Sequence, residues 1–196
     1  MRIDRREAIG RVTALLGGIA LAGGTRLLEA AERLHPSIRA AVTRRGVGAF
    51  TPQDVALLDD VADTILPQTT TPGAKAAQTG AFMALMVTDS YTESDQAVFR
   101  EGMEKLKAAS FMTLTPAQRL TMLAQLDREQ KAYMDARRRE DDTPRHSFRM
   151  MKELALLGYF TSEIGCTQAQ RYIEAPGRFD PCVPYAPGDS AWAGHA

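Results

Sequence analysis

The side chains best suited to chemistry are three histidines, His35, His146 and His195, and two cysteines. One histidine belongs to a known spacing, Glu32-x-x-His35, which puts a carboxylate and an imidazole one helical turn apart, as in di-iron bundles. Such a centre needs a second Glu-x-x-His pair and two further glutamates, and the sequence contains no second copy. We interpret Glu32 and His35 as a solvent-facing pair and expect the chain to bind no metal.

The other two histidines lack the neighbours that a general base requires. His195 is next to last, and His146 adjoins Arg145 at an expected helix start; neither has a sequence neighbour that would orient it for proton transfer. The sequence has no glycine-rich phosphate loop after a strand, no Gly-x-Ser-x-Gly elbow and no Cys-x-x-Cys-His haem attachment. We expect no catalytic residue in this chain and no cofactor bound by it.

The N-terminus has the pattern of an export signal. A basic segment with Arg5 and Arg6 precedes the uncharged stretch 12–24, which is too short for a membrane span of about 20 residues. Adjacent arginines indicate the twin-arginine route, which carries folded cargo. We predict an export signal over 1–24, with a cleavage site at Ala20-Leu21-Ala22. A buried or interfacial helix, or an uncleaved membrane tether, is the alternative.

Export affects what the cysteines, Cys166 and Cys182, are expected to do. An oxidising periplasm and an even cysteine count favour a disulfide, which would close a loop of about 17 residues and contribute about 3 kcal/mol in the chain-entropy model. A metal site is disfavoured, because two thiols without a Cys-x-x-Cys spacing cannot supply four ligands. We predict the Cys166–Cys182 disulfide, with unpaired or intermolecular thiols as the alternative.

Composition limits the class of protein. The 196 residues include 24 basic and 24 acidic side chains, a neutral balance that argues against nucleic-acid binding, which needs a basic surface. The 44% of apolar residues suffices for one core. Because long amphipathic segments dominate and no alternating strand pattern persists, we predict an all-α fold.

Helix signals divide the chain into an N-terminal helix and linker over 25–50, a small helical bundle over 51–163 and a tail over 164–196. Thr51-Pro52-Gln53-Asp54 and Thr115-Pro116-Ala117-Gln118 each combine a capping side chain with proline at the first helical position. The expected helices are 52–66, 76–91, 93–110, one beginning at 116, and 147–162. Their apolar stripes include Phe82, Leu85, Met86, Phe99, Met103, Leu106, Leu120, Leu123 and Leu126.

The helix expected over 147–162 is apolar on nearly every face. Such a helix is surrounded, so it lies either at the centre of the bundle or between the bundle and a partner. The tail that follows is rich in proline and aromatic residues and has no regular period, so we expect it to be extended. Its aromatic side chains, together with the two at the end of the helix, are our candidates for anchors at a partner interface: Tyr159, Phe160, Tyr172, Phe179, Tyr185 and Trp192.

Two pieces of sequence resemble one family. The segment Gly158-Tyr159-Phe160-Thr161-Ser162-Glu163, followed by Tyr172 and Pro176-Gly177, is similar to the signature of the gluconate 2-dehydrogenase subunit 3 family. Ile65-Leu66-Pro67 and Thr71-Pro72-Gly73-Ala74 match a second piece, in which a helix ends at a proline and the chain re-enters through Thr-Pro-Gly-Ala. The resemblance extends from about Thr51 to Trp192.

The resemblance implies a non-catalytic small subunit of a periplasmic dehydrogenase complex. Its partner would be a large GMC-type subunit that contains FAD and oxidises a sugar, a sugar acid or a polyol, with a cytochrome c or another molecule as the electron acceptor. The small subunit would supply the export signal and stabilise the large one, and would meet a membrane only through that signal or through the partner. A stand-alone periplasmic helical protein that binds a small ligand is the alternative function.

Overall fold

In the computed structural model the described residues are 38–136, 145–175, 177, 182, 184 and 186–193. The chain divides into two units, 1–40 and 41–196. Of the first unit only 38–40 are described, as the start of a helical stretch that ends at residue 45. The arrangement below is that of the second unit. Its described part is helical and has two isolated β-bridges but no strand, which confirms the all-α prediction.

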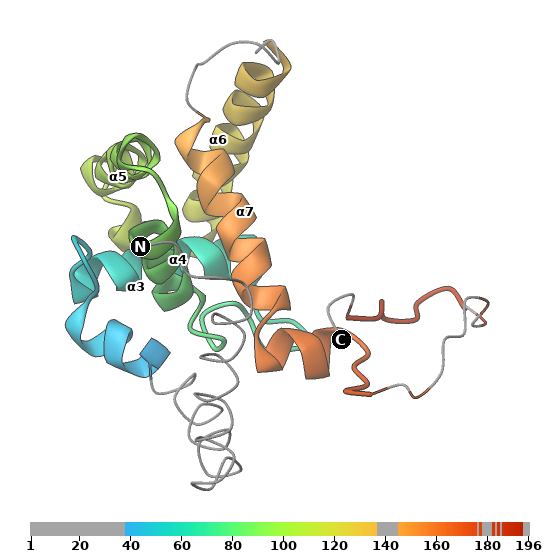
Figure 1. Cartoon of the computed structure of the whole chain (residues 1–196). Helices are drawn as coiled ribbons and strands as arrows, with labels where there is room; N and C mark the ends of the chain where they lie inside the picture. The colour runs from blue at the N-terminus through green and yellow to red at the C-terminus, as the bar shows by residue number, and fades with distance from the viewer. Residues whose placement is uncertain are drawn as a thin grey trace, which may run out of the picture. The chain divides into compact units, whose positions relative to one another are not determined.

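Most of the helices pack into one bundle (Figure 1). Two short elements, the 3-10 turn η1 and the π-helical turn η2, lie between or after them. After the helical stretch that ends at residue 45, the elements are α3 (Pro52–Ile65), α4 (Thr79–Ser90), α5 (Glu93–Ala108), η1 (Phe111–Thr113), α6 (Pro116–Ala136), α7 (Ser147–Phe160) and η2 (Gly165–Ala169). Across this part of the chain, no helix has both the length and the apolar character needed to cross a bilayer.

Both expected capping motifs are confirmed. At the start of α3, Thr51 Oγ1 accepts from the Asp54 backbone N–H at 3.2 Å, and Asp54 Oδ2 accepts from the Thr51 backbone N–H at 2.8 Å. At the start of α6, the Gln118 N–H donates to Thr115 Oγ1, and Gln118 Oε1 accepts from the Thr115 N–H. These reciprocal bonds satisfy backbone donors that the first helical turn leaves without partners.

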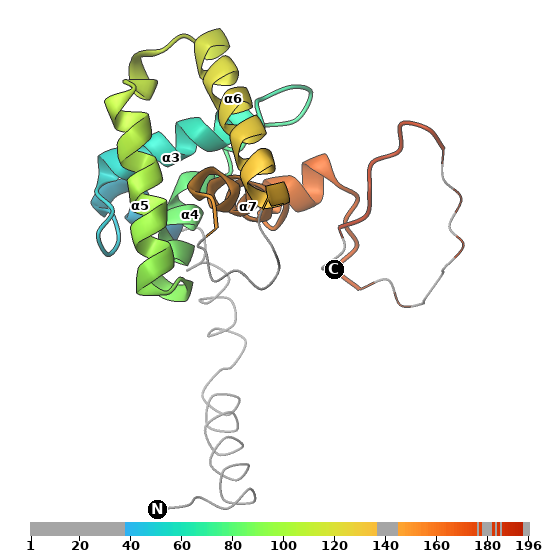
Figure 2. The ribbon, with the colours of Figure 1, turned by 90° about the horizontal axis from the view of Figure 1, so that it is seen from above.

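Helix α7 is the centre of the bundle, as the first of the two alternatives predicted. It packs against α3, α4, α5 and α6, and the view from above shows it among its neighbours (Figure 2). One side chain departs from this pattern, because Leu157 is 46% exposed. The buried residues of α7 lie on one broad side of the helix and are Phe148, Met150, Met151, Leu154, Ala155, Gly158 and Tyr159.

The expected start of α4 at Ala76 is wrong, since the helix begins at Thr79 after Gln78 in a left-handed conformation. Helices α3 and α4 approach each other closely at this point, because a Cβ on Gly80 would lie 2.5 Å from the Asp59 backbone nitrogen. Small residues therefore face α3, and the expected stripe is displaced. Phe82, Leu85 and Met86 are half-buried, whereas Ala81, Met83, Ala84 and Val87 are fully buried.

The expected inward position of Leu120 is also wrong, because this side chain is 58% exposed. Its neighbour Arg119 turns inward instead and donates from Nη1 to Asp60 Oδ2 at 2.8 Å. The same guanidinium donates to the carbonyls of Phe111 and Met112. A hydrogen-bonded ion pair thus orients the first turn of α6 in place of the leucine.

Candidate partner-binding surface

Two segments far apart in the sequence meet at the C-terminal end of α7. Tyr159 is 4% exposed, and its hydroxyl donates to the Pro72 carbonyl at 2.7 Å. Pro72 belongs to the loop after α3, which the Ala74 N–H closes by donating to the Leu66 carbonyl at 2.9 Å. Within this loop Gly73 is required, because a Cβ there would lie 2.7 Å from the Gln68 backbone nitrogen. The two pieces that carry the family resemblance are therefore in contact.

Carboxylates of α3 hold this loop in place. Asp60 accepts from Lys75 Nζ at 2.6 Å as well as from Arg119, and Asp63 Oδ1 accepts from the Lys75 N–H at 3.2 Å. The hydrogen bond to Asp60 raises the pKa of Lys75, which keeps this side chain charged. Each carboxylate is therefore bound to groups of its own chain.

Asp59 is buried, and desolvation raises its pKa to about 6. Its Oδ1 accepts from the Gly80 N–H at 2.7 Å, and this bond, together with the charge of Lys75, opposes the shift. Asp59 thus links α3 to the first turn of α4. Among the described residues, no group of three or more His, Cys, Asp or Glu side chains is placed to hold a metal ion.

Of the residues predicted as partner anchors, Tyr159 is buried in the hydrophobic core. A partner would reach its ring only after the core opened, so the interface proposed below does not include it. Phe160 is half-buried and packs edge-to-face on Tyr159, with ring centroids 5.1 Å apart. Tyr172 and Trp192 are each 43% exposed. Phe179 and Tyr185 lie outside the described residues.

The expected disulfide is not present: the structure forms no bond between Cys166 and Cys182. Cys166 lies in η2, where its thiol donates to the Phe160 carbonyl at 3.3 Å, and burial raises its pKa. Cys182 is exposed. The expectation that 164–196 is wholly extended is also wrong, because Gly165–Ala169 are helical. Gly165 is required there, since a Cβ would lie 2.0 Å from the Tyr159 carbonyl oxygen.

Contacts between Arg171 and residues 189–193 hold two parts of the tail together. The Arg171 N–H donates to the Ala191 carbonyl at 2.8 Å, and the Ala193 N–H donates to the Arg171 carbonyl at 2.9 Å. The Arg171 guanidinium lies 4.7 Å from the centre of the Trp192 ring, and its Nη1 lies 3.8 Å from Asp189 Oδ2. We call this arrangement the C-terminal clasp. No sequence motif predicts the clasp, because its two sides are separated by a stretch of sequence without periodicity.

The clasp carries an exposed apolar group. Tyr172 and Ile173 follow Arg171 directly and are 43% and 44% exposed. Trp192, on the other side of the clasp, is 43% exposed. Two polar atoms beside them, Arg171 Nε and Gln170 Oε1, are buried and have no hydrogen-bond partner within the part of the chain that the structure describes. An exposed group of aromatic and aliphatic side chains beside an arginine has the composition of an interface core.

The remaining candidate side chains have structural roles or lie outside the described residues. His146 caps α7, because its Nδ1 accepts from the Phe148 N–H at 3.2 Å. Arg5, Arg6, Glu32, His35 and His195 lie outside the described residues, so the export motif stays a prediction.

Comparison with known proteins identifies one family. The family model described as gluconate 2-dehydrogenase subunit 3 matches residues 52–177, which extend from the first residue of α3 into the tail. The match includes the Pro72–Tyr159 contact and the Arg171 side of the clasp. The searches of curated proteins and of solved structures gave no match. Because the model covers more than half of the sequence, the chain belongs to the gluconate 2-dehydrogenase subunit 3 family.

Proposed function

We propose that this protein is the non-catalytic small subunit of an exported flavin-dependent dehydrogenase that oxidises a sugar, a sugar acid or a polyol. Membership of the subunit 3 family carries this proposal. FAD and the substrate pocket belong to the large GMC-type subunit, and a cytochrome c accepts the electrons. The acidic side chains of α3 support a structural role for this chain, because they bind its own lysine, arginine and backbone groups.

The C-terminal clasp is the surface that we propose for the large subunit. Tryptophan, tyrosine and arginine contribute most often to the energy of protein interfaces, and all three types meet here in Trp192, Tyr172 and Arg171. Tyr172 and Trp192 are each 43% exposed, so a partner can cover both rings without opening the fold.

Export is the second part of the proposed role. The adjacent Arg5 and Arg6 belong to a twin-arginine signal that directs the folded complex to the periplasm. Because that route carries folded cargo, the small subunit must bind the large one before export. The clasp therefore acts in the cytoplasm first and stabilises the mature complex afterwards.

Affinity purification tests the proposal. A tag placed after Ala196 on a flexible linker allows recovery of the protein from the periplasmic fraction, and the eluate is examined for a second band and for flavin absorbance. We expect a yellow eluate with a larger partner in stoichiometric amount. A colourless monomer would instead favour the stand-alone ligand-binding protein.

Matched variants test the surface. Trp192→Ala should reduce recovery of the flavin subunit by about tenfold, because removing an interface anchor costs on the order of 1–2 kcal/mol or more. Tyr133→Ala is the control, since this tyrosine on α6 is also exposed, at 39%. Equal recovery from both variants would rule out the clasp as the docking surface while leaving the subunit role intact.

A further inference from the structure

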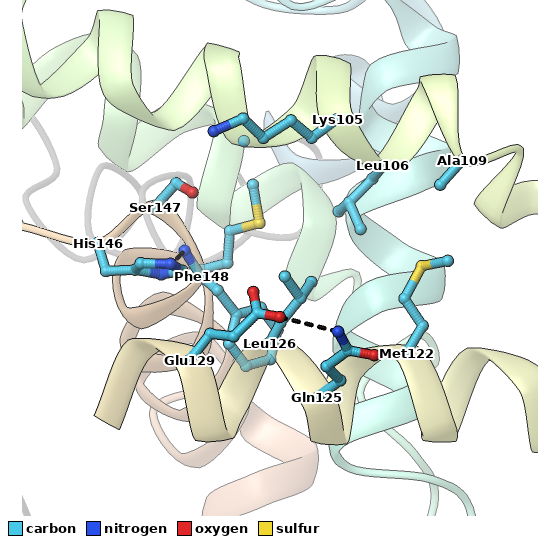
Figure 3. A pocket seen from close by; sticks show the side chains of 12 residues that line it. Lys105, Leu106, Ala109, Met122, Gln125, Leu126, Glu129, His146, Ser147 and Phe148 are labelled. Carbon is cyan, nitrogen blue, oxygen red and sulfur yellow. Dashed lines mark hydrogen bonds between the residues drawn. The ribbon is translucent and has the colours of Figure 1, made fainter. Parts of the chain in front are cut away.

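A groove unrelated to the clasp lies between α5, α6 and the start of α7, with a cavity volume of about 300 Å³ (Figure 3). Helix α7 forms its floor, with the buried side chains of Phe148 and Met151. Its walls come from residues at matching spacings on two helices. These are Gly102, Lys105, Leu106 and Ala109 on α5 or at its end, and Met122, Gln125, Leu126 and Glu129 on α6.

The fold keeps this groove open. Both walls have the spacing i, i+3, i+4, i+7, which is one face of a helix, and both helices pack on α7. At one end α5 touches the start of α7, because a Cβ on Gly102 would lie 2.5 Å from Ser147 Cβ. Two turns later, the short side chain of Ala109 leaves space that a larger residue would fill. The groove therefore follows from side-chain size at two positions of α5.

The mouth of the groove is rich in hydrogen-bond donors. His146 Nδ1 accepts from the Phe148 N–H, and burial lowers the pKa of this histidine. The neutral ring thus carries its proton on Nε2, which is a donor. Lys105 supplies an ammonium group and pairs with Glu101 at 2.8 Å. The mouth also carries acceptors, which are the side-chain oxygen of Gln125 and the carboxylate of Glu129, whose Oε1 accepts from Gln125 Nε2 at 2.9 Å.

We propose that this groove binds a small, mainly apolar molecule, about one to two rings in size, that presents an oxygen acceptor to His146 and Lys105. A cavity of about 150 Å³ accommodates benzene, and small-molecule sites begin at about 300 Å³, with apolar walls and a few polar groups that fix orientation. Met122 and Met151 adapt readily to different apolar shapes. A carbonyl or carboxylate oxygen is the group that the donors at the mouth would select.

Acetophenone and ethylbenzene test this proposal, because they share a carbon skeleton and differ in the carbonyl oxygen. The full chain, together with any subunit that co-purifies with it, is titrated with each probe and followed by saturation-transfer difference NMR. We expect acetophenone to saturate with a Kd on the order of 1 mM. Ethylbenzene should bind about three- to tenfold more weakly, the effect of one net hydrogen bond.

Two tryptophan substitutions locate the binding site. Ala109→Trp fills the groove from its exposed rim and should abolish the saturable acetophenone signal. Ala108→Trp adds the same ring one residue away, at an exposed position that does not line the groove, and should leave the signal unchanged. Absence of saturable binding, or equal binding by wild type and Ala109→Trp, would overturn the site. Equal affinity for the two probes would overturn the proposed preference for an oxygen acceptor. Neither result depends on recovery of the flavin subunit.

Discussion

The Tyr159 hydroxyl donates to the Pro72 carbonyl at 2.7 Å, across 87 positions of sequence. This bond joins the end of the central helix α7 to the loop that follows α3. Because Tyr159 is buried while Tyr172, further along the chain, is exposed, the two tyrosines have different roles. The first stabilises the fold, and the second is available to a partner.

Tyr159→Phe should lower the free energy of unfolding by about 1 kcal/mol, because it removes one hydrogen bond and leaves a partly buried carbonyl without its donor. Tyr159→Ala should cost about 3–5 kcal/mol, since it also removes a buried aromatic ring. Urea denaturation followed by circular dichroism measures both effects. Tyr172→Phe is the control and should leave the urea midpoint unchanged. A Tyr159→Phe protein as stable as wild type would contradict the role of the bond.

Asp59 should make stability depend on pH between about 4 and 6. Its pKa is raised to about 6 in the folded state from the ordinary value of 3.8, so the folded protein holds a proton that the unfolded chain has lost. Stability due to Asp59 is therefore fully present below about pH 4 and declines as pH rises to about 6, by up to about 3 kcal/mol.

Asp59→Asn isolates this contribution, because the amide keeps an oxygen that can accept from the Gly80 N–H but does not titrate. The unfolding free energies of wild type and variant are measured by urea denaturation at pH 4 and at pH 7. We expect the wild type to lose stability relative to the variant as pH rises between these values. A constant difference would show that burial does not raise the pKa of Asp59.

Asp60→Asn should destabilise the protein by about 2–3 kcal/mol, because Asp60 is buried and binds both Arg119 and Lys75. This expected loss of unfolding free energy lies between the losses measured when exposed ion pairs and fully buried ion pairs are broken. Asp135→Asn provides the same chemical change in an exposed pair with Lys131 and should leave the urea midpoint unchanged. If the two variants behave alike, the Asp60 pairs contribute no more than surface charges do.

Trp192→Ala should open the C-terminal clasp in the absence of a partner. A cation–π contact at an exposed site contributes about 0.5–1 kcal/mol, so the open population should rise about two- to fivefold. Hydrogen–deuterium exchange measures this change as faster exchange of the Arg171 and Ala193 backbone N–H groups, which are hydrogen-bonded in the closed clasp. Tyr172→Ala is the matched control, because the clasp contacts do not include this side chain. Equal exchange rates in both variants would mean that Trp192 does not hold the clasp closed.

Local sequence signals determined the helical character of the bundle and most of its boundaries. Thr51 and Thr115 cap their helices as expected, because a cap depends only on residues within one turn. The central place of α7 was one of two alternatives that its all-round apolar sequence allowed. The family resemblance was also readable from short motifs and is supported by the match over 52–177.

Tertiary structure decided which side chains are buried and what they contact. Arg119 rather than Leu120 turns inward and binds Asp60, and the buried Tyr159 donates to the Pro72 carbonyl. The clasp between Arg171 and Trp192 holds the tail where a disulfide was expected. Each of these contacts joins residues far apart in the sequence. Periodicity and composition describe one segment at a time, so the partners that meet across segments are specified only when the helices pack.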